Sequence, residues 1–343
     1  MAMALYAPGL GYYSRGSRQF GTLPASGSDF VTAPELSPLF GQALARQVAQ
    51  ALAGSSTREV WEFGAGSGAL AEQLLAALDD LGAAVDRYTI VDLSGALRER
   101  QRERLLRFGA KVQWVDALPD AMQGVIVGNE VLDAMPVQLL HFDGAQWFER
   151  GVAAVDEALQ WADHRTDLRP RLDGPDGGSF APGSTVEIHP QAEAFIATLA
   201  DRLTRGAAFF IDYGFPAAEY YHPQRTGGTL MCHRAHLADT DPLVDVGEKD
   251  ITAHVNFSGM ALAAQNAGLA VLGYTTQAHF LMNCGVMELL QGADIKTTAN
   301  SQKLLTEHEM GELFKVIGMA KNCDPAFMQA PLGFARGDRT HTL

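Results

Sequence analysis

The stretch EVWEFGAGSGAL, residues 59–70, decides the fold of this chain. It starts with the apolar run 60–63, has glycines at positions 64, 66 and 68, and then places leucines at 70, 74, 75 and 78. An apolar run, spaced glycines and helical spacing, in this order, predict a strand, a tight turn and a helix. Because glycine has no Cβ, a ligand can come close to the backbone of such a turn.

Segments with strand and helix patterns alternate along much of the chain. A helix is predicted from Pro34, with Thr32 as its N-cap and Gly54 at its end. Strands are predicted at 58–63, 87–92, 111–115, 123–128, 207–212, 269–276 and 332–337, and helices at 68–81, 94–108 and 257–267. This alternation indicates an α/β fold with a parallel sheet and right-handed crossovers.

Two segments interrupt the alternation. Two runs of alternating apolar residues surround Asp143-Gly144, which predicts a β-hairpin, and a second irregular region covers 214–252. We expect both to be insertions that form a lid or a substrate-facing subdomain. The expected organisation is an entry segment and helix at 1–57, the first half of the core at 58–136, a β-rich insertion at 137–188 and the second half of the core at 189–343.

The charge of the chain limits its partners. The 343 residues carry a formal net charge of −14, so the chain lacks the excess of Lys and Arg that non-specific nucleic-acid binding needs. An acidic protein can instead attract a basic substrate by long-range steering. No apolar stretch reaches the length of about 18 residues that predicts a membrane span.

The cysteines indicate a reducing compartment. Cys232, Cys284 and Cys323 are few, odd in number and without pattern, so no disulfide framework is expected. Cys232, His233 and His236 have no second cluster of ligands in the sequence, so no metal site is predicted. The first residues do not have the pattern of a signal peptide. We expect a cytoplasmic protein, or a mitochondrial-matrix protein if the source is eukaryotic.

The glycine turn discriminates between ligands. No Lys follows Gly68, which excludes the phosphate-binding loop G-x-x-x-x-G-K-[ST]. The dinucleotide fingerprint G-x-G-x-x-G would need its third glycine one residue later. The turn reads E-x-G-x-G-x-G, which is the first motif of class I S-adenosylmethionine (SAM) methyltransferases. The predicted cofactor-binding residues of the turn are Glu62, Gly64, Ala65, Gly66 and Gly68.

Carboxylates follow the next two strands. Asp92 ends the strand 87–92, where ligands of open α/β sheets bind, and its carboxylate can accept both hydroxyls of a ribose. The alternative is that Asp92 caps the following helix. Asp116 follows the strand 111–115 and is placed to accept from an adenine amino group, although it could also be a turn residue. We predict that both residues bind the cofactor.

The fourth strand is followed by Asn129, Glu130 and Asp133. In this fold its end adjoins the methyl group that is transferred, and two carboxylates three residues apart can form a site for a cation. The alternative is a helix N-terminus, where the dipole favours acidic residues. We predict that Asn129 binds the cofactor and that Glu130 and Asp133 act on the acceptor, where carboxylates can pair with an arginine guanidinium.

Seven strings occur in a fixed order along the chain: GYYSRGSRQFG, DFVTAPELSPLFG, EFGAGSGAL, GNEVLDAMPVQ, FIDYGF, GGTLMCHRAH and DITAHVNF. Together they resemble the MidA-like family, over roughly residues 4–290, with Ser28 where the family has glycine. The resemblance implies a Rossmann-like SAM methyltransferase fold. For the mitochondrial member it implies symmetric dimethylation of an arginine in a complex I subunit. The family's SAM contacts fall on Glu62, Gly64, Ala65, Gly66, Asp92 and Asp116.

Three functions remain open from the sequence. The first is a SAM-dependent methyltransferase that acts on an arginine of a protein, with a basic or arginine-containing segment as its partner. The second is a dinucleotide-dependent oxidoreductase, and the third is a non-catalytic assembly factor that keeps the SAM fold as a binding module. Glu62, Asp92 and Asp116 favour the first function over the second. Glu130 and Asp133 favour it over the third.

Overall fold

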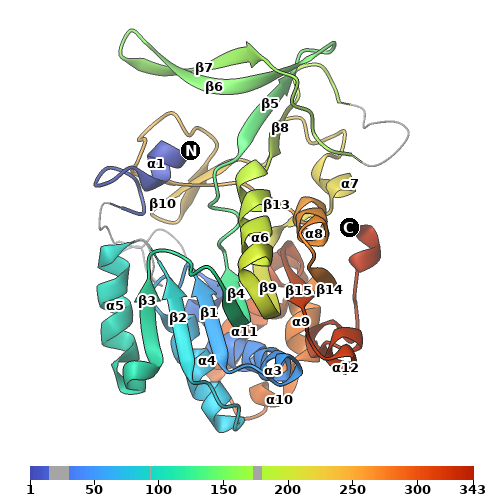
Figure 1. The fold of residues 1–343 in the computed structure, drawn as a ribbon. Helices are drawn as coiled ribbons and strands as arrows, with labels where there is room; N and C mark the ends of the chain where they lie inside the picture. Colours follow the sequence, from blue (N-terminus) through green and yellow to red (C-terminus); the bar gives the residue numbers. More distant parts are fainter. Residues whose placement is uncertain (15–30, 93, 173–179) are drawn as a thin grey trace.

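The computed structural model describes residues 1–14, 31–92, 94–172 and 180–343, and the string GSDF with Ser28 lies outside them. Within these residues the main sheet has eight strands in the order β14-β15-β9-β4-β1-β2-β3, with β13 beside β9, as Figure 1 shows. The strands are β1 (Glu59–Phe63), β2 (Arg87–Val91), β3 (Val112–Val115), β4 (Met122–Asn129), β9 (Leu203–Phe215), β13 (Val255–Asn256), β14 (Ala270–Thr276) and β15 (Phe314–Lys321).

The directions of the strands distinguish this sheet from the dinucleotide-binding one. The five strands β3, β2, β1, β4 and β9 are parallel to one another. The strand β15 is antiparallel to both β9 and β14. The sheet of dinucleotide-binding folds has the order 3-2-1-4-5-6, without such a reversed strand. The predicted α/β fold is confirmed.

Helices cover both faces of the main sheet. One core packs the sheet against α3 (Pro38–Ser55), α4 (Ala69–Asp80), α9 (Gln277–Asn283) and α11 (Ile295–Leu305). The other packs it against α6 (Pro190–Arg202) and α8 (Phe257–Asn266). Neighbouring residues of β9 face opposite cores, since Phe209 belongs to the first and Phe210 to the second. A strand buried on both faces is a continuous apolar run, which is why AAFFI was recognisable.

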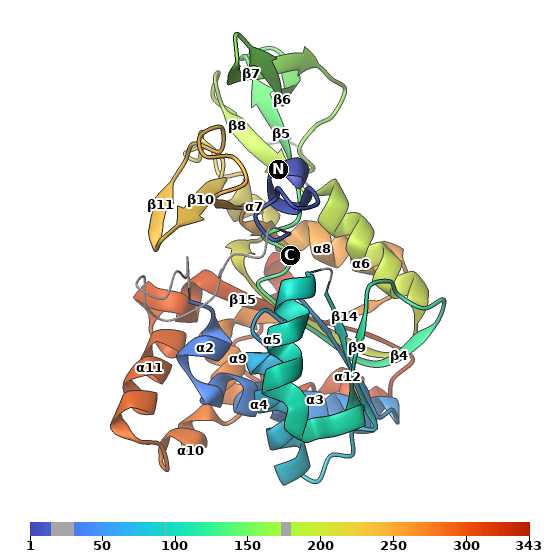
Figure 2. The same cartoon turned by 90° about the vertical axis from the view of Figure 1, so that its left-hand side faces the viewer.

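The other helices lie at the edge of the main sheet or outside its two layers. The helix α5 (Gly95–Leu105) lies at the β3 edge of the sheet, as Figures 1 and 2 show. The remaining helices are α1 (Ala2–Tyr6), α2 (Ala33–Leu36), α7 (Ala217–Tyr220), α10 (Val286–Leu290) and α12 (Pro325–Gln329). Among the described residues, no helix is long and apolar enough to span a membrane.

Two small sheets lie beyond the carboxyl edge of the main sheet (Figure 2). One has the order β7-β6-β5-β8, and the other β11-β10-β12. The first is built from β5 (Gln138–Phe142), β6 (Trp147–Val155), β7 (Ala158–Arg165) and β8 (Thr185–Ile188). The second is built from β10 (Met231–Arg234), β11 (Leu237–Asp239) and β12 (Asp250–Thr252). They fall within the two segments that interrupt the βα alternation.

The predicted hairpin around Asp143 joins β5 to β6. Phe142 pairs with Trp147 across the turn. The Asp143 carboxylate closes the turn, because its Oδ1 accepts hydrogen bonds from the backbone N–H groups of Ala145 at 2.7 Å and Gln146 at 2.8 Å. This is the local hydrogen bonding that makes aspartate a turn residue.

The predicted helix from Pro34 is two helices. The chain bends at Ser37, whose φ is −152°, so α2 ends there and α3 begins at Pro38. Thr32 is at the N-cap of α2 without a side-chain hydrogen bond. Ser37 caps α3, because its hydroxyl accepts from the Leu39 N–H at 3.2 Å. The end was misplaced by only one residue, since α3 continues to Ser55.

The prediction of a last strand at 332–337 was wrong. Leu332–Phe334 forms a short 3₁₀ turn, and the missing strand is β15 at Phe314–Lys321. The ring of Phe334 lies against two glycines of the sheet: a Cβ on Gly273 would be 2.3 Å from it, and one on Gly318 2.7 Å. The apolar residues of LGFARG therefore cover the sheet instead of extending it.

We predict that Phe334→Ala destabilises the protein by about 3–5 kcal/mol, because it empties a buried site that the two glycines cannot fill. Phe334 is 6 % exposed. Urea unfolding measures the change. Leu237→Ala is the control, because Leu237 is 74 % exposed and should change the free energy of unfolding by less than about 0.5 kcal/mol. Equal stability of the Phe334 variant and the wild type would contradict this packing role.

Candidate active site

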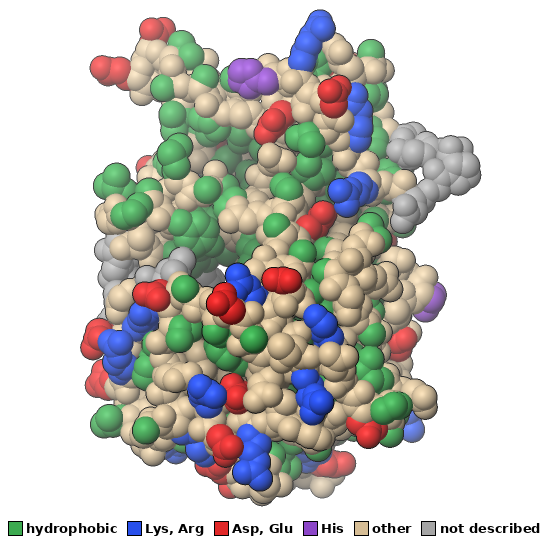
Figure 3. Space-filling view, in the orientation of Figure 1, with side chains coloured by type: hydrophobic (Ala, Val, Ile, Leu, Met, Phe, Trp, Pro, Cys, Tyr) green, Lys and Arg blue, Asp and Glu red, His purple; other side chains and the backbone are tan. Residues whose placement is uncertain are grey.

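A cavity of about 870 Å³ lies at the carboxyl ends of the parallel strands. Its floor comes from the residues that end β1, β2, β4 and β9, which is where open α/β sheets bind ligands. Its opposite wall comes from the N-terminal segment and from the β10–β12 sheet, with Tyr6, Tyr13, Met231, His233 and Asp250. In Figure 3 the surface is hollowed between the two halves of the molecule, and hydrophobic side chains gather there.

The glycine turn forms one end of the cavity. Gly64, Ala65 and Gly66 line it, and both glycines have left-handed φ values, 62° and 52°. A Cβ on Gly64 would be 3.0 Å from the Val131 side chain. Gly68 is the N-cap of α4 with φ 83° and lies behind the turn, where a Cβ would be 3.5 Å from the Cα of Gln101.

Asp92 lies beside this turn, after the end of β2. Its Oδ1 accepts a hydrogen bond from the Ser94 N–H, and its Oδ2 accepts one from Gln101 Nε2, each at 2.8 Å. The helix α5 is capped by the Ser94 hydroxyl. The Asp92 carboxylate lines the cavity without acting as the helix cap.

The structure does not bring Asp116 to the cavity. It is an exposed residue in the bend after β3, and it is not among the residues that line the cavity. The sequence places Asp116 after a strand but does not define which way the chain turns there. That Asp116 accepts from an adenine amino group stays a prediction.

Glu62 lies inside the sheet at the floor of the cavity. It is 2 % exposed, and its Oε2 accepts a hydrogen bond from the Tyr88 hydroxyl at 2.7 Å. Burial raises the pKa of Glu62 to about 8, and the nearby charge of Asp92 also raises it, while the Tyr88 bond lowers it. A buried carboxyl of this kind is suited to a positively charged group of a ligand.

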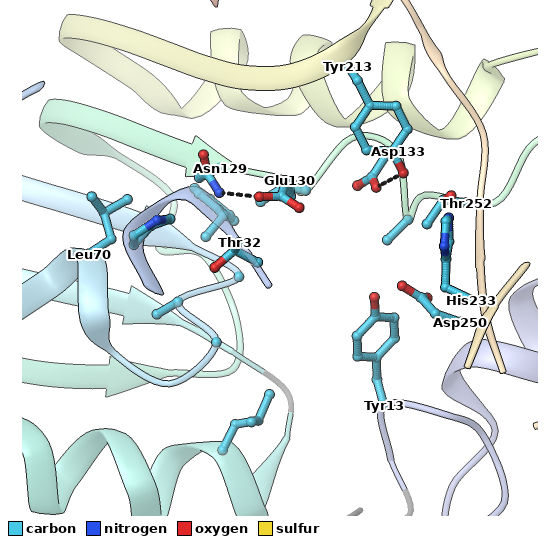
Figure 4. A pocket seen from close by; sticks show the side chains of 18 of the residues that line it. Tyr13, Thr32, Leu70, Asn129, Glu130, Asp133, Tyr213, His233, Asp250 and Thr252 are labelled. Atoms are coloured by element: carbon cyan, nitrogen blue, oxygen red, sulfur yellow. Dashed lines mark hydrogen bonds between the residues drawn. The ribbon is translucent and has the colours of Figure 1, made fainter. Parts of the chain in front are cut away.

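Asn129 and Glu130 lie between the glycine turn and the far wall (Figure 4). Asn129 Nδ2 donates to Glu130 Oε1 at 2.9 Å, whereas Asn129 Oδ1 is buried without a partner within the described residues. The Glu130 backbone has a φ of 53°, which is uncommon and unfavourable for a residue other than glycine. Its N–H donates to the Ile211 carbonyl at 2.9 Å.

The pKa of Glu130 is raised to about 8. Burial is the largest cause, and the neighbouring Asp133 charge acts in the same direction. Hydrogen bonds from Asn129 and from the Ala33 backbone N–H lower it only in part. A raised pKa in a cavity is typical of functional carboxyls.

Asp133 lies across the cavity from Tyr13 (Figure 4). Its Oδ2 accepts a hydrogen bond from the Tyr213 hydroxyl at 2.6 Å. Its Oδ1 is buried and has no hydrogen-bond partner within the described residues. Burial raises the pKa of Asp133 to about 6, although the Tyr213 bond lowers it. Asp133 therefore presents an acceptor oxygen to which a ligand can donate.

The lining is acidic and holds no fixed cation among the residues that the structure describes. Its carboxyls are Glu35, Glu62, Asp92, Glu130, Asp133 and Asp250, and none of its described residues is Lys or Arg. Burial lowers the pKa of His233, and that of His254 to about 4, so both are neutral near pH 7. This lining favours cationic ligands and gives a pyrophosphate no cationic partner.

The three cysteines are free. Within the described residues, no group of three or more His, Cys, Asp and Glu side chains is arranged to hold a metal ion. His233 lines the cavity, while Cys232 is buried against the N-terminal segment with Leu5 and Tyr12. In this structure Cys232 is thus a packing residue.

Known proteins resemble this chain over most of its length. The pattern of the family described as "Putative S-adenosyl-L-methionine-dependent methyltransferase" matches residues 43–275. The chain belongs to this family. A crystal structure from Burkholderia thailandensis that holds S-adenosyl-homocysteine is 52 % identical, with a TM-score of 0.94 over 100 % of this chain and 90 % of the other. The predicted Rossmann-like SAM methyltransferase fold and the predicted cofactor, SAM, are confirmed.

More distant relatives carry a more specific name. The Caenorhabditis elegans "Protein arginine methyltransferase NDUFAF7 homolog, mitochondrial" is 27 % identical over 85 % of this chain and 73 % of the relative. The Homo sapiens "Protein arginine methyltransferase NDUFAF7, mitochondrial" is 26 % identical over 93 % of this chain and 78 % of the relative.

The cavity fits SAM. Its volume is within the range of small-molecule sites, about 300–1,000 Å³, with room left for part of an acceptor. We propose that Gly64, Ala65, Gly66, Asp92 and Asn129 contact the cofactor, with Glu62 beneath it and Gly68 supporting the turn. The buried Asn129 Oδ1, which lacks a partner within the described residues, is the acceptor atom that this arrangement leaves for the cofactor.

Sequence reasoning missed three residues that the structure brings to or behind the cavity: Tyr13, Gln101 and Asp250. The string FIDYGF did place Tyr213 at the end of a strand, where ligands bind. Gln101 was signalled only by being the one uncharged residue of RERQRER. No sequence signal connects Tyr13 or Asp250 to the strand ends, because they come from segments that reach the cavity by tertiary packing.

We predict that Asp92→Ala weakens binding of S-adenosylhomocysteine about 10- to 150-fold, the equivalent of a hydrogen bond to a charged group. Isothermal titration calorimetry with the purified protein measures the dissociation constant. Asp80→Ala is the matched control, because it removes the same group at the exposed end of α4, outside the cavity lining. A folded Asp92 variant with wild-type affinity would mean that Asp92 does not bind the cofactor.

We also predict that Glu130→Gln stabilises the ligand-free protein at high pH. The folded-state pKa of Glu130 is raised to about 8, so its contribution to stability is present at low pH and is lost as pH rises through that value. Gln keeps the shape without the buried charge. In urea unfolding, the free energy of unfolding of the variant minus that of the wild type should be at least about 1 kcal/mol larger at pH ~8.5 than at pH ~5. The same difference between variant and wild type at both pH values would refute this.

Proposed function

We propose that this SAM-dependent methyltransferase methylates the guanidinium of an arginine in a protein. The observation that carries the proposal is the Asp133 Oδ1 atom, buried without a partner in the described residues, opposite Tyr13 and near Glu130 (Figure 4). A planar guanidinium has several N–H donors and no acceptor. It can therefore pair with two carboxylates and stack on tyrosine rings at the same time.

The acceptor end of the cavity has the composition that this substrate needs. Carboxylates come from the turn after β4 (Glu130 and Asp133) and from β12 (Asp250), and Tyr13 and Tyr213 line the same end. Tyr213 is held edge-to-face against His254, with ring centroids 5.2 Å apart. Rigid aromatic walls reduce the entropy that a bound side chain must lose.

Asp133 and Glu130 have different roles in the proposed reaction. SAM, when bound, supplies an electrophilic methyl group for in-line displacement. Asp133 orients the guanidinium so that one nitrogen faces the methyl, and alignment of this kind can lower a barrier by about 7–11 kcal/mol. Glu130 pairs with the same cation and accepts the proton that the methylated nitrogen releases. Its raised pKa suits that transfer near neutral pH.

A protein acceptor is consistent with the charge and with the relatives. The net charge of −14 attracts a basic segment. The relatives named protein arginine methyltransferases are mitochondrial, and their names support arginine as the target. A subunit of respiratory complex I as its carrier is what the resemblance to the MidA-like family implies. The proposal includes a role in complex I assembly. It also includes a location in the cytoplasm, or in the mitochondrial matrix if the source is eukaryotic.

The test of this function is a transfer reaction with labelled SAM. Protein extract from a strain that lacks the gene is incubated with the purified enzyme, and the labelled protein and residue are identified by mass spectrometry. Methyl-arginine supports the proposal. Label on another residue type would replace arginine as the target, and SAM binding without any transfer would favour the non-catalytic assembly factor.

We predict that Glu130→Gln slows the chemical step at least about 100-fold, a typical contribution of general acid–base catalysis, while the affinity for SAM changes little. Single-turnover methylation measures the step, and calorimetry measures the affinity. Glu149→Gln, which makes the same change on β6, outside the cavity lining, is the control. A Glu130→Gln and Asp133→Asn double variant with wild-type turnover would remove the basis of the mechanism.

A further inference from the structure

One buried side chain joins three parts of the cofactor end. Gln101 is 0 % exposed, although it lies in the highly charged helix α5. Its Nε2 donates to the Gly66 carbonyl at 2.9 Å and to Asp92 Oδ2 at 2.8 Å. Its Oε1 accepts from the Trp114 indole N–H at 2.9 Å. The amide thus contacts the glycine turn, the carboxylate after β2 and the strand β3.

The partners define the orientation of the amide. An indole N–H can only donate, and a backbone carbonyl can only accept. Trp114 must therefore face the Gln101 oxygen, and Gly66 must face the nitrogen. The same nitrogen has a second hydrogen, and Asp92 accepts it. Rotating the amide by half a turn would place donor against donor and acceptor against acceptor.

Gly68, whose φ is 83°, lies next to Gln101 at the start of α4. A Cβ on Gly68 would be 3.5 Å from both the Cα and the Cγ of Gln101, so α5 packs directly against the glycine turn. The Arg98 guanidinium adds a second tie, because its Nε donates to the Asp92 carbonyl at 2.7 Å. The main chain and the side chain of Asp92 are thus both held by α5.

We infer that Gln101 is a positioning residue that sets the Asp92 carboxylate at a fixed distance from the glycine turn, so that one cofactor can contact both. The inference rests on the proposed contact between Asp92 and the ribose hydroxyls of SAM. Gln101 is not among the residues that line the cavity, so it acts through Asp92 and Gly66. A neutral amide is required because a carboxyl there would repel Asp92.

The experiment compares affinities for S-adenosylhomocysteine at about pH 6 and about pH 9 by calorimetry. In Gln101→Glu the introduced carboxyl next to Asp92 has a raised pKa, is neutral at the lower pH and is charged at the higher one. Relative to the wild type at the same pH, the dissociation constant of this variant should rise at least about tenfold at the higher pH and less at the lower pH. Gln101→Met, which adds no charge, should lose affinity about equally at both.

Gln113→Glu is the matched control. Gln113 lies on β3 and donates to Thr89 Oγ1 at 2.9 Å, so the variant makes the same change of charge in the neighbouring strands, outside the cavity lining. It should bind with wild-type affinity at both pH values. A purely structural role of Gln101 would lower the melting temperature without a pH-dependent change of affinity.

The outcomes separate this inference from the assignment of Asp92. If Asp92→Ala binds as the wild type does, the ribose contact is wrong. If Asp92→Ala binds weakly but Gln101→Glu binds with wild-type affinity at both pH values, the role of Gln101 is wrong. An equal loss in Gln113→Glu would also overturn it, because the effect would then come from net charge. If Gln101→Glu does not fold, wild-type affinity of Gln101→Met overturns the inference.

Discussion

The acidic end of the cavity depends on one carboxylate beneath it. Asp212 is fully buried, and its Oδ2 accepts hydrogen bonds from three consecutive N–H groups, those of Val131, Leu132 and Asp133, at 3.1, 2.9 and 3.2 Å. The turn after β4 is thereby tied to the end of β9. Without this carboxylate, three backbone donors would be left unpaired, at a cost of about 1–3 kcal/mol each.

Holding this turn concentrates negative charge, which is unfavourable in the free protein. Burial and the charges of Asp133 and Glu130 raise the pKa of Asp212, and the backbone donors act against this. Burial and the Asp133 charge raise the pKa of Glu130, and burial raises that of Asp133. This repulsion destabilises the free protein. A bound cation would remove it, and the free energy released would add to the affinity for a cationic ligand.

The cofactor end could be predicted because it is local in sequence. The apolar run and glycines at 59–68 fix a strand, a turn and a helix, and the end of the next strand follows at Asp92. The sequence does not define the direction of the chain after β3, where Asp116 is exposed in a bend. The strand β15 was not predicted, because Lys315 and Gly318 interrupt its apolar run. In the structure Lys315 is nevertheless only 5 % exposed.

The acceptor end is assembled from distant segments, and this explains why the sequence predicts it less completely. Tyr13, Asp133, Tyr213 and Asp250 converge from the N-terminal segment, the turn after β4, the end of β9 and the β10–β12 sheet (Figure 4). No periodicity or spacing links these residues, since tertiary packing alone brings them together. The glycine turn is set by local geometry, whereas the acceptor wall depends on how the N-terminal segment and the β10–β12 sheet pack. Membership of the family therefore defines the methyl donor, and the acceptor has to be argued from the carboxylates and tyrosines that this chain places around the donor.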